Sequence, residues 1–171
     1  MFKQLVKFNK KLKKNLQILI FFCIEHKNEV NMKLVTISDI MSKKLITIGP
    51  DERVMDIIDL FEKHKVHHLP VKDKKSKEII GMVSEKDVAN FLNIMRLMSS
   101  KNYPLKVEEI MTTPIFAYYE DVGIDQAAKA MLDNKIHAIL VVSKETEEYI
   151  GIITSKDLLK YLSEHKQYHV Q

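Results

Sequence analysis

GMVSEKD at residues 81–87 and GIITSKD at residues 151–157 are two copies of one short stretch, separated by 70 positions. Each copy is a glycine with two apolar residues, followed by Ser or Thr and, three positions later, by Asp. An apolar run that ends in [ST]-x-x-[DE] is typical of a strand that leads directly into a helix. Two such junctions indicate that the body of the chain is an internal duplication.

The duplication extends far beyond the two junctions. The same shift, without a gap, pairs Ile40 and Met41 with Ile110 and Met111, Asp51 with Asp121, His67 with His137, and Val71 with Val141. One register held over this length is not chance similarity. The predicted organisation is a leader, a first repeat, a connector, a second repeat and a tail, at residues 1–31, 32–98, 99–104, 105–165 and 166–171.

The first half of each repeat predicts a strand followed by a helix. Short apolar strands are expected at residues 45–48 and 115–118. Asp51 and Asp121 come next, and we expect their side chains to cap the helices that follow. Apolar residues then recur at i, i+3, i+4 and i+7, the spacing of one helix face: Val54, Ile57, Ile58 and Phe61, and in the second copy Ile124, Ala127, Ala128 and Met131.

The second half of each repeat predicts two strands and another helix. The strands are expected at residues 66–71 and 79–83, and at 136–142 and 149–153, dense enough in apolar residues to be buried on two faces. Ser84 and Thr154 then begin helices with predicted inward residues Val88, Phe91, Leu92 and Met95, and Leu158, Tyr161 and Leu162. Each repeat is therefore β-α-β-β-α, and the fold class is α+β, with small sheets and flanking helices. A unit this small buries little surface alone, so we expect the repeats to pair about a pseudo-two-fold axis.

Composition and charge exclude several classes of protein. The chain has 171 residues, of which 46% are hydrophobic and 29% charged, as in soluble globular proteins. Its single cysteine, Cys23, permits no disulfide within the chain and fits a reducing cytoplasm. Residues 1–31 hold seven lysines and two glutamates, a net charge of +5, which leaves 20 basic and 21 acidic residues, or −1, for the remainder. The body therefore lacks the basic surplus of a nucleic-acid-binding surface.

The leader is open to three interpretations. Its apolar run at residues 16–24 is shorter than the roughly 20 residues that span a bilayer as a helix. It is a membrane-touching amphipathic segment, a degenerate targeting signal without a small-residue cleavage site, or sequence upstream of a natural start at Met32. We favour the start at Met32, and contact with a membrane is expected only if the leader is native.

This pattern resembles the CBS domain pair, also called a Bateman module, over roughly residues 33–165. The resemblance rests on the openings Asp39-Ile40-Met41 and Glu109-Ile110-Met111, the strand HHLPV at residues 67–71, and above all the two junctions. The second copy has Leu140 where the first has Pro70, a difference from which we expect little effect.

The resemblance implies that adenosine-containing ligands (AMP, ADP, ATP or S-adenosylmethionine) bind in clefts between the repeats. Asp87 and Asp157 would accept hydrogen bonds from ribose hydroxyl groups. Ser84 and Thr154 would lie beside the phosphates, with Lys86 and Lys156 as countercharges. The base would lie against residues of the first strand and of the start of the second: Ile46, Val66 and His67, and in the other copy Phe116, Ile136 and His137.

Simpler interpretations compete with this site. Ser84-x-x-Asp87 and Thr154-x-x-Asp157 are also ordinary helix caps, and a cap and a ligand contact can coexist. His64, His67 and His68 lie close in sequence, but adjacent strand residues point to opposite faces, so we expect no metal site. The chain has no P-loop, no G-x-G-x-x-G and no evident nucleophile with its base, so we expect no catalytic residues.

The predicted function is a regulatory module that senses an adenosine-containing ligand and transmits its occupancy to a dimer or a partner. It requires no cofactor, and a homodimer is implied by the resemblance. Two alternatives remain open: a dimerisation or interaction module with empty clefts, and a regulatory subunit of a separately encoded enzyme or transporter. A DNA-binding regulator is disfavoured by the charge of the body.

Overall fold

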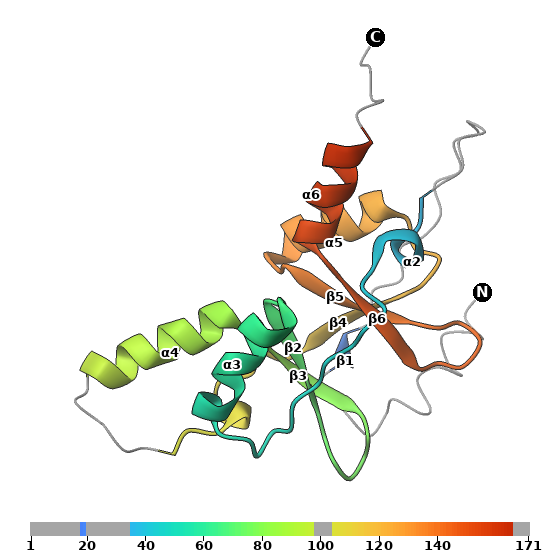
Figure 1. The fold of residues 1–171 in the computed structure, drawn as a ribbon. Helices are drawn as coiled ribbons and strands as arrows, with labels where there is room; N and C mark the ends of the chain where they lie inside the picture. Colours follow the sequence, from blue (N-terminus) through green and yellow to red (C-terminus); the bar gives the residue numbers. More distant parts are fainter. Residues whose placement is uncertain (1–17, 20–34, 98–103, 166–171) are drawn as a thin grey trace. The chain divides into compact units, whose positions relative to one another are not determined.

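The computed structural model describes residues 18–19, 35–97 and 104–165 (Figure 1). Apart from residues 18–19, they form two compact units, which we call unit 1 (residues 46–97 and 104–115) and unit 2 (residues 35–45 and 116–165). The predictions for the rest of the leader, including Cys23 and a start at Met32, for most of the connector and for the tail lie outside the described residues.

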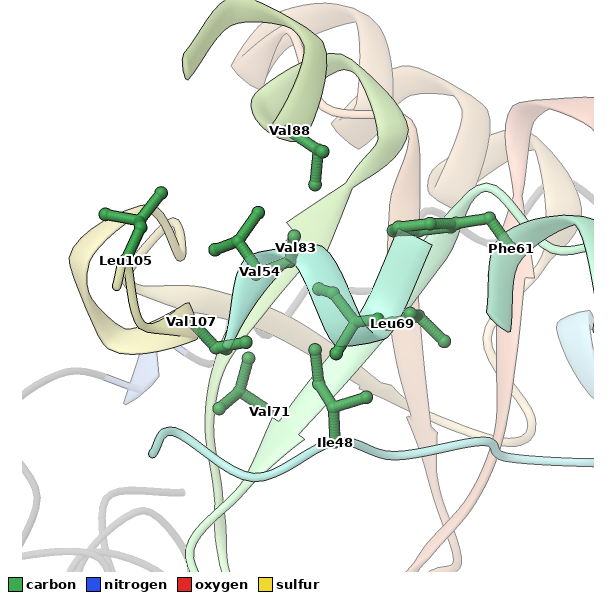
Figure 2. Close-up of a cluster of buried hydrophobic side chains, with 10 residues drawn as sticks. Ile48, Val54, Phe61, Leu69, Val71, Val83, Val88, Leu105 and Val107 are labelled. Carbon is green, nitrogen blue, oxygen red and sulfur yellow. The ribbon is translucent and has the colours of Figure 1, made fainter. Parts of the chain in front are cut away.

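Unit 1 contains a two-stranded sheet, two long helices and one 3-10 turn. Strand β2 (His68–Lys72) pairs antiparallel with β3 (Ile79–Ser84). Helix α3 (Val54–His64) precedes this hairpin, α4 (Glu85–Leu97) follows it, and η1 (Val107–Glu109) completes the unit. The core is a cluster of ten buried residues, to which each of these elements contributes at least one side chain (Figure 2).

Unit 2 has the same plan with a larger sheet, in the order β1–β4–β5–β6. Strand β4 (Ile115–Tyr119) runs parallel to β5 (Ala138–Val142), which pairs antiparallel with β6 (Tyr149–Thr154); β1 is the two-residue strand Ile18–Leu19. The helices are α2 (Ile37–Ile40), α5 (Ile124–Asn134) and α6 (Ser155–Glu164).

Most of the predicted elements are confirmed. The helix faces read from the i, i+3, i+4, i+7 spacing are the buried ones, with Val54, Ile57 and Phe61 at most 4% exposed in α3. Burial on two faces is confirmed for β5 but wrong for β3, in which buried and half-buried residues alternate. Leu92 and Leu162, predicted to point inward, are 37% and 51% exposed.

The strand predicted at residues 45–48 is not formed; only Ile48 makes a β-bridge, to Val71. Ile48 donates to the Pro70 carbonyl over 3.0 Å and accepts from the Lys72 N–H over 2.8 Å. The next donor along β2 would be residue 70, and proline has no N–H to give. In unit 2 the equivalent Leu140 lies in a parallel ladder opposite Ala117. The exchange of leucine for proline, expected to matter little, thus coincides with the loss of a strand.

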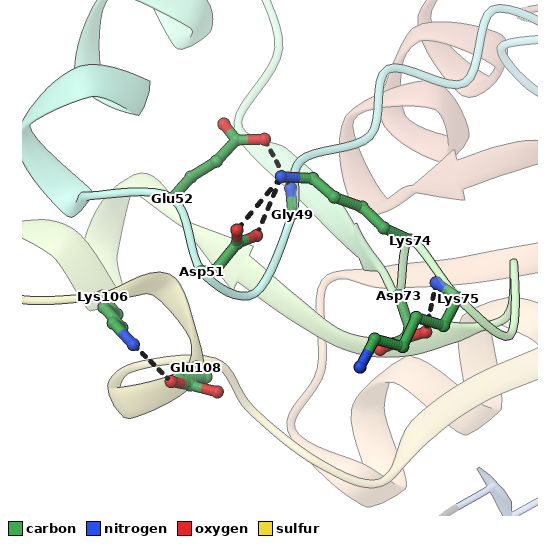
Figure 3. Close-up of polar contacts among 8 residues, drawn as sticks. All are labelled: Gly49, Asp51, Glu52, Asp73, Lys74, Lys75, Lys106 and Glu108. Atoms are coloured by element: carbon green, nitrogen blue, oxygen red, sulfur yellow. Dashed lines mark hydrogen bonds and ion pairs between the residues drawn. The ribbon is translucent and has the colours of Figure 1, made fainter.

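Asp51 and Asp121 do not cap the helices, contrary to the prediction. The N-cap residues are Arg53 and Gly123, neither with a side-chain cap bond. Asp51 instead pairs with Lys74 of the β2–β3 turn at 3.0 Å (Figure 3), and Asp121 pairs with Lys144 of the β5–β6 turn. The hydrogen bond from Lys74 lowers the pKa of Asp51 from its usual value. In both units this ion pair therefore links the segment just before the helix to the turn of the hairpin.

The first N–H of each of these helices is bonded by a distant segment. The Val54 N–H donates to the Leu105 carbonyl over 2.9 Å, and the Ile124 N–H donates to the Val35 carbonyl over 3.1 Å. Residues 35–45 open repeat 1 but belong to unit 2, and residues 105–115 open repeat 2 but belong, with residue 104 of the connector, to unit 1. We call residues 35–45 and 104–115 the exchanged segments, since each completes the unit formed by the rest of the other repeat.

Candidate functional site

The strand-to-helix junctions form the same capping box in both units. In unit 1, Asp87 Oδ2 accepts from the Ser84 N–H over 2.8 Å and from Ser84 Oγ over 2.5 Å, and the Asp87 N–H donates to Ser84 Oγ over 3.2 Å. In unit 2, Asp157 Oδ2 accepts from the Thr154 N–H and Oγ1 over 2.8 and 2.7 Å. The interpretation as a helix cap is therefore correct for both copies.

Each capping carboxylate uses one oxygen only. Within residues 35–97 and 104–165, no hydrogen bond reaches Oδ1 of Asp87 or of Asp157. Both side chains are half-buried at the start of their helices. A carboxylate oxygen accepts up to two hydrogen bonds, so each junction presents an oriented acceptor whose partner oxygen is already satisfied.

The histidines that precede β2 and β5 lie against the junctions. The Glu85 N–H donates to the His67 carbonyl over 3.2 Å, and the Ser155 N–H donates to the His137 carbonyl over 3.0 Å. The side chains differ, because His67 Nδ1 lies 2.7 Å from Glu85 Oε2 whereas His137 Nδ1 lies 3.5 Å from Ser155 Oγ. The structure thus brings both histidines to the helix starts.

Each of the remaining predicted residues lies in the unit of its own aspartate. Lys86 and Lys156 are exposed at the first turns of α4 and α6. Four apolar residues are half-buried and pack against the core of their unit: Ile46 and Val66 in unit 1, Phe116 and Ile136 in unit 2.

A cavity of about 480 Å³ opens beside Asp157 in unit 2. Its walls come from α6 and from the exchanged segment around α2, and its lining residues are Val35, Asp39, Ile40, Asp157, Lys160, Tyr161, Glu164 and His165. Another hollow, of about 290 Å³ between α3 and α4, contains none of the predicted site residues.

Sequence reasoning assigned only Asp157 among the residues that line the larger cavity. Lys160, Tyr161 and Glu164 follow Asp157 at i+3, i+4 and i+7, so helical spacing could have found them. Asp39 could not be found this way, because it reaches the cavity through the exchanged segment.

The described part of the chain contains neither a metal-binding cluster nor a membrane-spanning helix. In the described part of the chain, no three His, Cys, Asp or Glu side chains gather closely enough to hold a metal ion. Among the same residues, no helix has the length and apolar character needed to cross a membrane.

Removing the hydroxyl groups of the caps is expected to destabilise the protein modestly. Ser84→Ala and Thr154→Ala should each lower the free energy of unfolding by about 1 kcal/mol, because the N–H of the third helical residue loses its acceptor. Urea denaturation measures the change, with Ser163→Ala as the control: that exposed hydroxyl bonds only the Lys160 carbonyl. A Thr154→Ala protein as stable as the control would contradict the capping role.

Comparison with known proteins places these observations in a family. The family model for the CBS domain matches residues 37–94 and 107–164. The uncharacterised protein MJ1426 of Methanocaldococcus jannaschii is 30% identical over 167 residues, an alignment that covers 81% of this chain and 98% of that protein. Inosine-5′-monophosphate dehydrogenase of the same organism is 30% identical over 122 residues, but the match covers 71% of this chain and only 22% of the dehydrogenase.

Two solved structures share the fold. The CBS domain pair of protein MJ0100 in complex with 5′-methylthioadenosine and S-adenosyl-L-methionine has a TM-score of 0.64 at 26% identity, covering 77% of this chain and 98% of that one. CBSX2 of Arabidopsis thaliana in complex with AMP has a TM-score of 0.61 at 27% identity, with the same two coverages.

Proposed function

The chain belongs to the CBS domain family, with two copies that form a CBS pair, and from this membership we propose that it is a regulatory module for an adenosine-containing ligand. Asp87 and Asp157 would hold the ribose of that ligand. The observation that carries the proposal is the geometry of these two carboxylates, each with Oδ2 inside a capping box and Oδ1 without a hydrogen bond from the described residues.

The chemistry of ribose suits this arrangement. Its two adjacent hydroxyl groups are donors, and an ionised carboxylate is a pure acceptor, so the pair forms charge-assisted hydrogen bonds. The capping box holds the carboxylate in place before the ligand arrives, which reduces the entropy lost on binding. A phosphate beside Ser84 or Thr154 would meet the positive end of a helix dipole, with Lys86 or Lys156 as a countercharge.

The ligands of related proteins support this class. The pair of MJ0100 is solved with 5′-methylthioadenosine and S-adenosyl-L-methionine, and CBSX2 with AMP. These molecules share adenosine and differ in what the 5′ carbon carries. We therefore propose the adenosyl group as the common feature, and a ligand that acts as a signal rather than as a required cofactor.

A role without catalysis is part of the proposal. The dehydrogenase match covers about a fifth of that enzyme, so the activity of the whole enzyme does not transfer to this chain. A ligand would act here by preferring one conformation of the module and shifting its population.

The alternative function is an interaction module, and exposed leucines favour it. Leu97 on α4 and Leu159 on α6 are 85% and 67% exposed, and further apolar side chains are exposed on the same helices: Leu92, Ile94 and Leu162. Exposed apolar helix surface of this kind is suited to a homodimer or to a protein partner. The two functions are compatible, since ligand binding could control association.

Conservative amide variants test the ribose contacts. Asp87→Asn and Asp157→Asn should each weaken binding to their site about tenfold, the loss of about 1.4 kcal/mol that follows when a hydrogen bond loses its charge. Their unfolding free energies should fall by about 1 kcal/mol or less, because the amide oxygen still accepts from the backbone.

Isothermal titration with AMP, ATP, 5′-methylthioadenosine and S-adenosylmethionine measures the affinities, and thermal denaturation checks stability. Asp125→Asn is the matched control, since Asp125 is an exposed acid in the first turn of α5. Absence of heat with all four compounds would leave the interaction module as the function, whereas unchanged affinity in both variants would remove the aspartates from the site.

A further inference from the structure

The cavity beside Asp157 is acidic. Three carboxylates line it, those of Asp39, Asp157 and Glu164, against the single ammonium of Lys160. That ammonium lies 4.0 Å from Glu164, so its charge is already directed toward one of the three. The lining carries a formal charge of −2 with His165 neutral, and Lys156, the expected countercharge for a phosphate, is not part of it.

Two aromatic rings add to this preference. Tyr161 and His165 stack with their ring centroids 4.2 Å apart, and both residues line the cavity. The face of a tyrosine ring attracts a cation through its quadrupole, most strongly where the contact is partly shielded from water. The Tyr161 ring and the carboxylates therefore both favour a ligand with a positive charge.

The equivalent positions of unit 1 keep the formal charge of −2, because Glu109 and Asp87 correspond to Asp39 and Asp157, but they differ on the helix. The 70-residue shift takes the α6 residues Lys160, Tyr161, Glu164 and His165 to Asn90, Phe91, Ile94 and Met95 of α4. None of these four replacements carries a charge, and all but the asparagine are apolar. The two units therefore share the capping aspartate and an acid of the exchanged segment, and they differ in the helix surface, which carries Lys160 and Glu164 in unit 2 and is mostly apolar in unit 1.

We propose that the cavity between α2 and α6 binds the 5′ substituent of an adenosyl ligand that carries positive charge there, as the sulfonium and ammonium groups of S-adenosylmethionine do. This inference rests on the proposed function, because Asp157 must hold the ribose for the substituent to reach the cavity. Its volume of about 480 Å³ is in the usual range for small-molecule pockets. A polyphosphate placed there would face three carboxylates and be repelled.

Comparison of three ligands at the unit 2 site tests the sign of the charge. Asp87→Asn weakens the unit 1 site and so lets the other be observed. 5′-Methylthioadenosine has an uncharged substituent, S-adenosylmethionine a cationic one and ATP an anionic one. On this background we expect S-adenosylmethionine to bind most tightly and ATP most weakly by isothermal titration at low ionic strength.

Two variants then test whether the carboxylates of the cavity cause the preference for a cationic ligand. Glu164→Gln should weaken S-adenosylmethionine about two- to fivefold, the factor for one partly exposed charge contact, and Asp39→Asn with Glu164→Gln about tenfold. Affinity for 5′-methylthioadenosine should not change, since its substituent has no charge. Glu145→Gln is the control, because Glu145 is an exposed acid of the β5–β6 turn outside the cavity.

The possible outcomes separate this inference from the proposed function. ATP binding as tightly as S-adenosylmethionine, or a Glu164→Gln protein with unchanged preference, would overturn the cationic cavity and leave the adenosine site intact. Binding that survives Asp157→Asn but is lost in Asp87→Asn would place the ligand in unit 1 and also overturn it. No binding of any adenosyl compound to the unsubstituted protein is the separate result that ends the proposed function.

Discussion

Replacing Ile37 by alanine is expected to lower the free energy of unfolding of unit 2 by about 2–5 kcal/mol, the range for truncation of a large buried side chain. Ile37 is 0% exposed and belongs to the same buried cluster as Ile139 and Ile153. Its removal leaves a cavity among residues of the second repeat, although residue 37 opens the first. The loss of stability in the Ile37→Ala protein therefore tests directly whether residues 35–45 pack into unit 2.

Hydrogen exchange shows which unit loses stability. In the Ile37→Ala protein, amides of α5, β5 and β6 should lose protection, whereas those of the β2–β3 hairpin should keep theirs. Val107→Ala is the matched variant, because Val107 is the equivalent residue 70 positions later, is 0% exposed and lies in the unit 1 core. It should produce the opposite pattern. Loss of protection in β2 and β3 on Ile37→Ala would show that residues 35–45 belong with unit 1.

Substitution of the junction glycines is expected to have the second large effect on stability. A Cβ at residue 151 would lie 2.6 Å from Met41 Sδ and 2.7 Å from the Ser42 carbonyl oxygen. One at residue 81 would lie 2.6 Å from Met111 Sδ, with the other near atoms also in the Met111 side chain. Overpacking costs about 1–3 kcal/mol, and we expect Gly151→Ala near the top of that range because a backbone atom cannot rotate away.

Double variants separate side-chain from backbone overlap. Met111→Ala should recover much of the stability lost in Gly81→Ala, since it removes Sδ and Cγ, the two closest atoms. Met41→Ala should recover less in Gly151→Ala, because the Ser42 carbonyl remains. Urea denaturation of each single and double variant gives the coupling energies. Equal recovery at both positions would mean that the backbone contact at residue 151 does not limit the packing.

The methionine contacts are part of a common docking arrangement. Ser42 and Ile152 exchange two backbone hydrogen bonds of 2.9 and 3.0 Å, and Thr112 and Met82 exchange two of 2.8 and 3.1 Å. Each exchanged segment therefore bonds the edge of a hairpin next to a glycine that its methionine covers. At residue 151 the backbone of the neighbouring segment approaches too closely for a Cβ, whereas at residue 81 only the Met111 side chain does.

Local patterns in the sequence were sufficient for most of the elements. The apolar spacing in α3 and α5 depends only on the helical period, and the capping boxes at Asp87 and Asp157 involve residues three positions apart. Both are short-range properties, so they could be read before any tertiary contact was known. The predicted acidic acceptor at each junction follows from the same local geometry.

Two of the predictions that failed depended on distant partners. Asp51 was expected to cap α3, but the Leu105 carbonyl accepts from the first helical N–H, and Asp51 pairs with Lys74. The strand expected at residues 45–48 needed a donor from a neighbouring strand, and that position is Pro70. In both cases the local pattern was present in the sequence. A group far away in the sequence determined whether the predicted cap or strand formed.

The sequence by itself determined the duplication, the order of the long helices and the hairpin in each repeat, and the two aspartates at the helix starts. Only the tertiary structure decided which unit each opening segment completes and which side chains surround Asp157. The physical reason is that Asp39-Ile40-Met41 and Glu109-Ile110-Met111 are chemically similar and face similar glycines, so periodicity cannot assign either to a unit. Packing and backbone hydrogen bonds across the repeats make that assignment, and with it they bring Asp39 to the cavity beside Asp157.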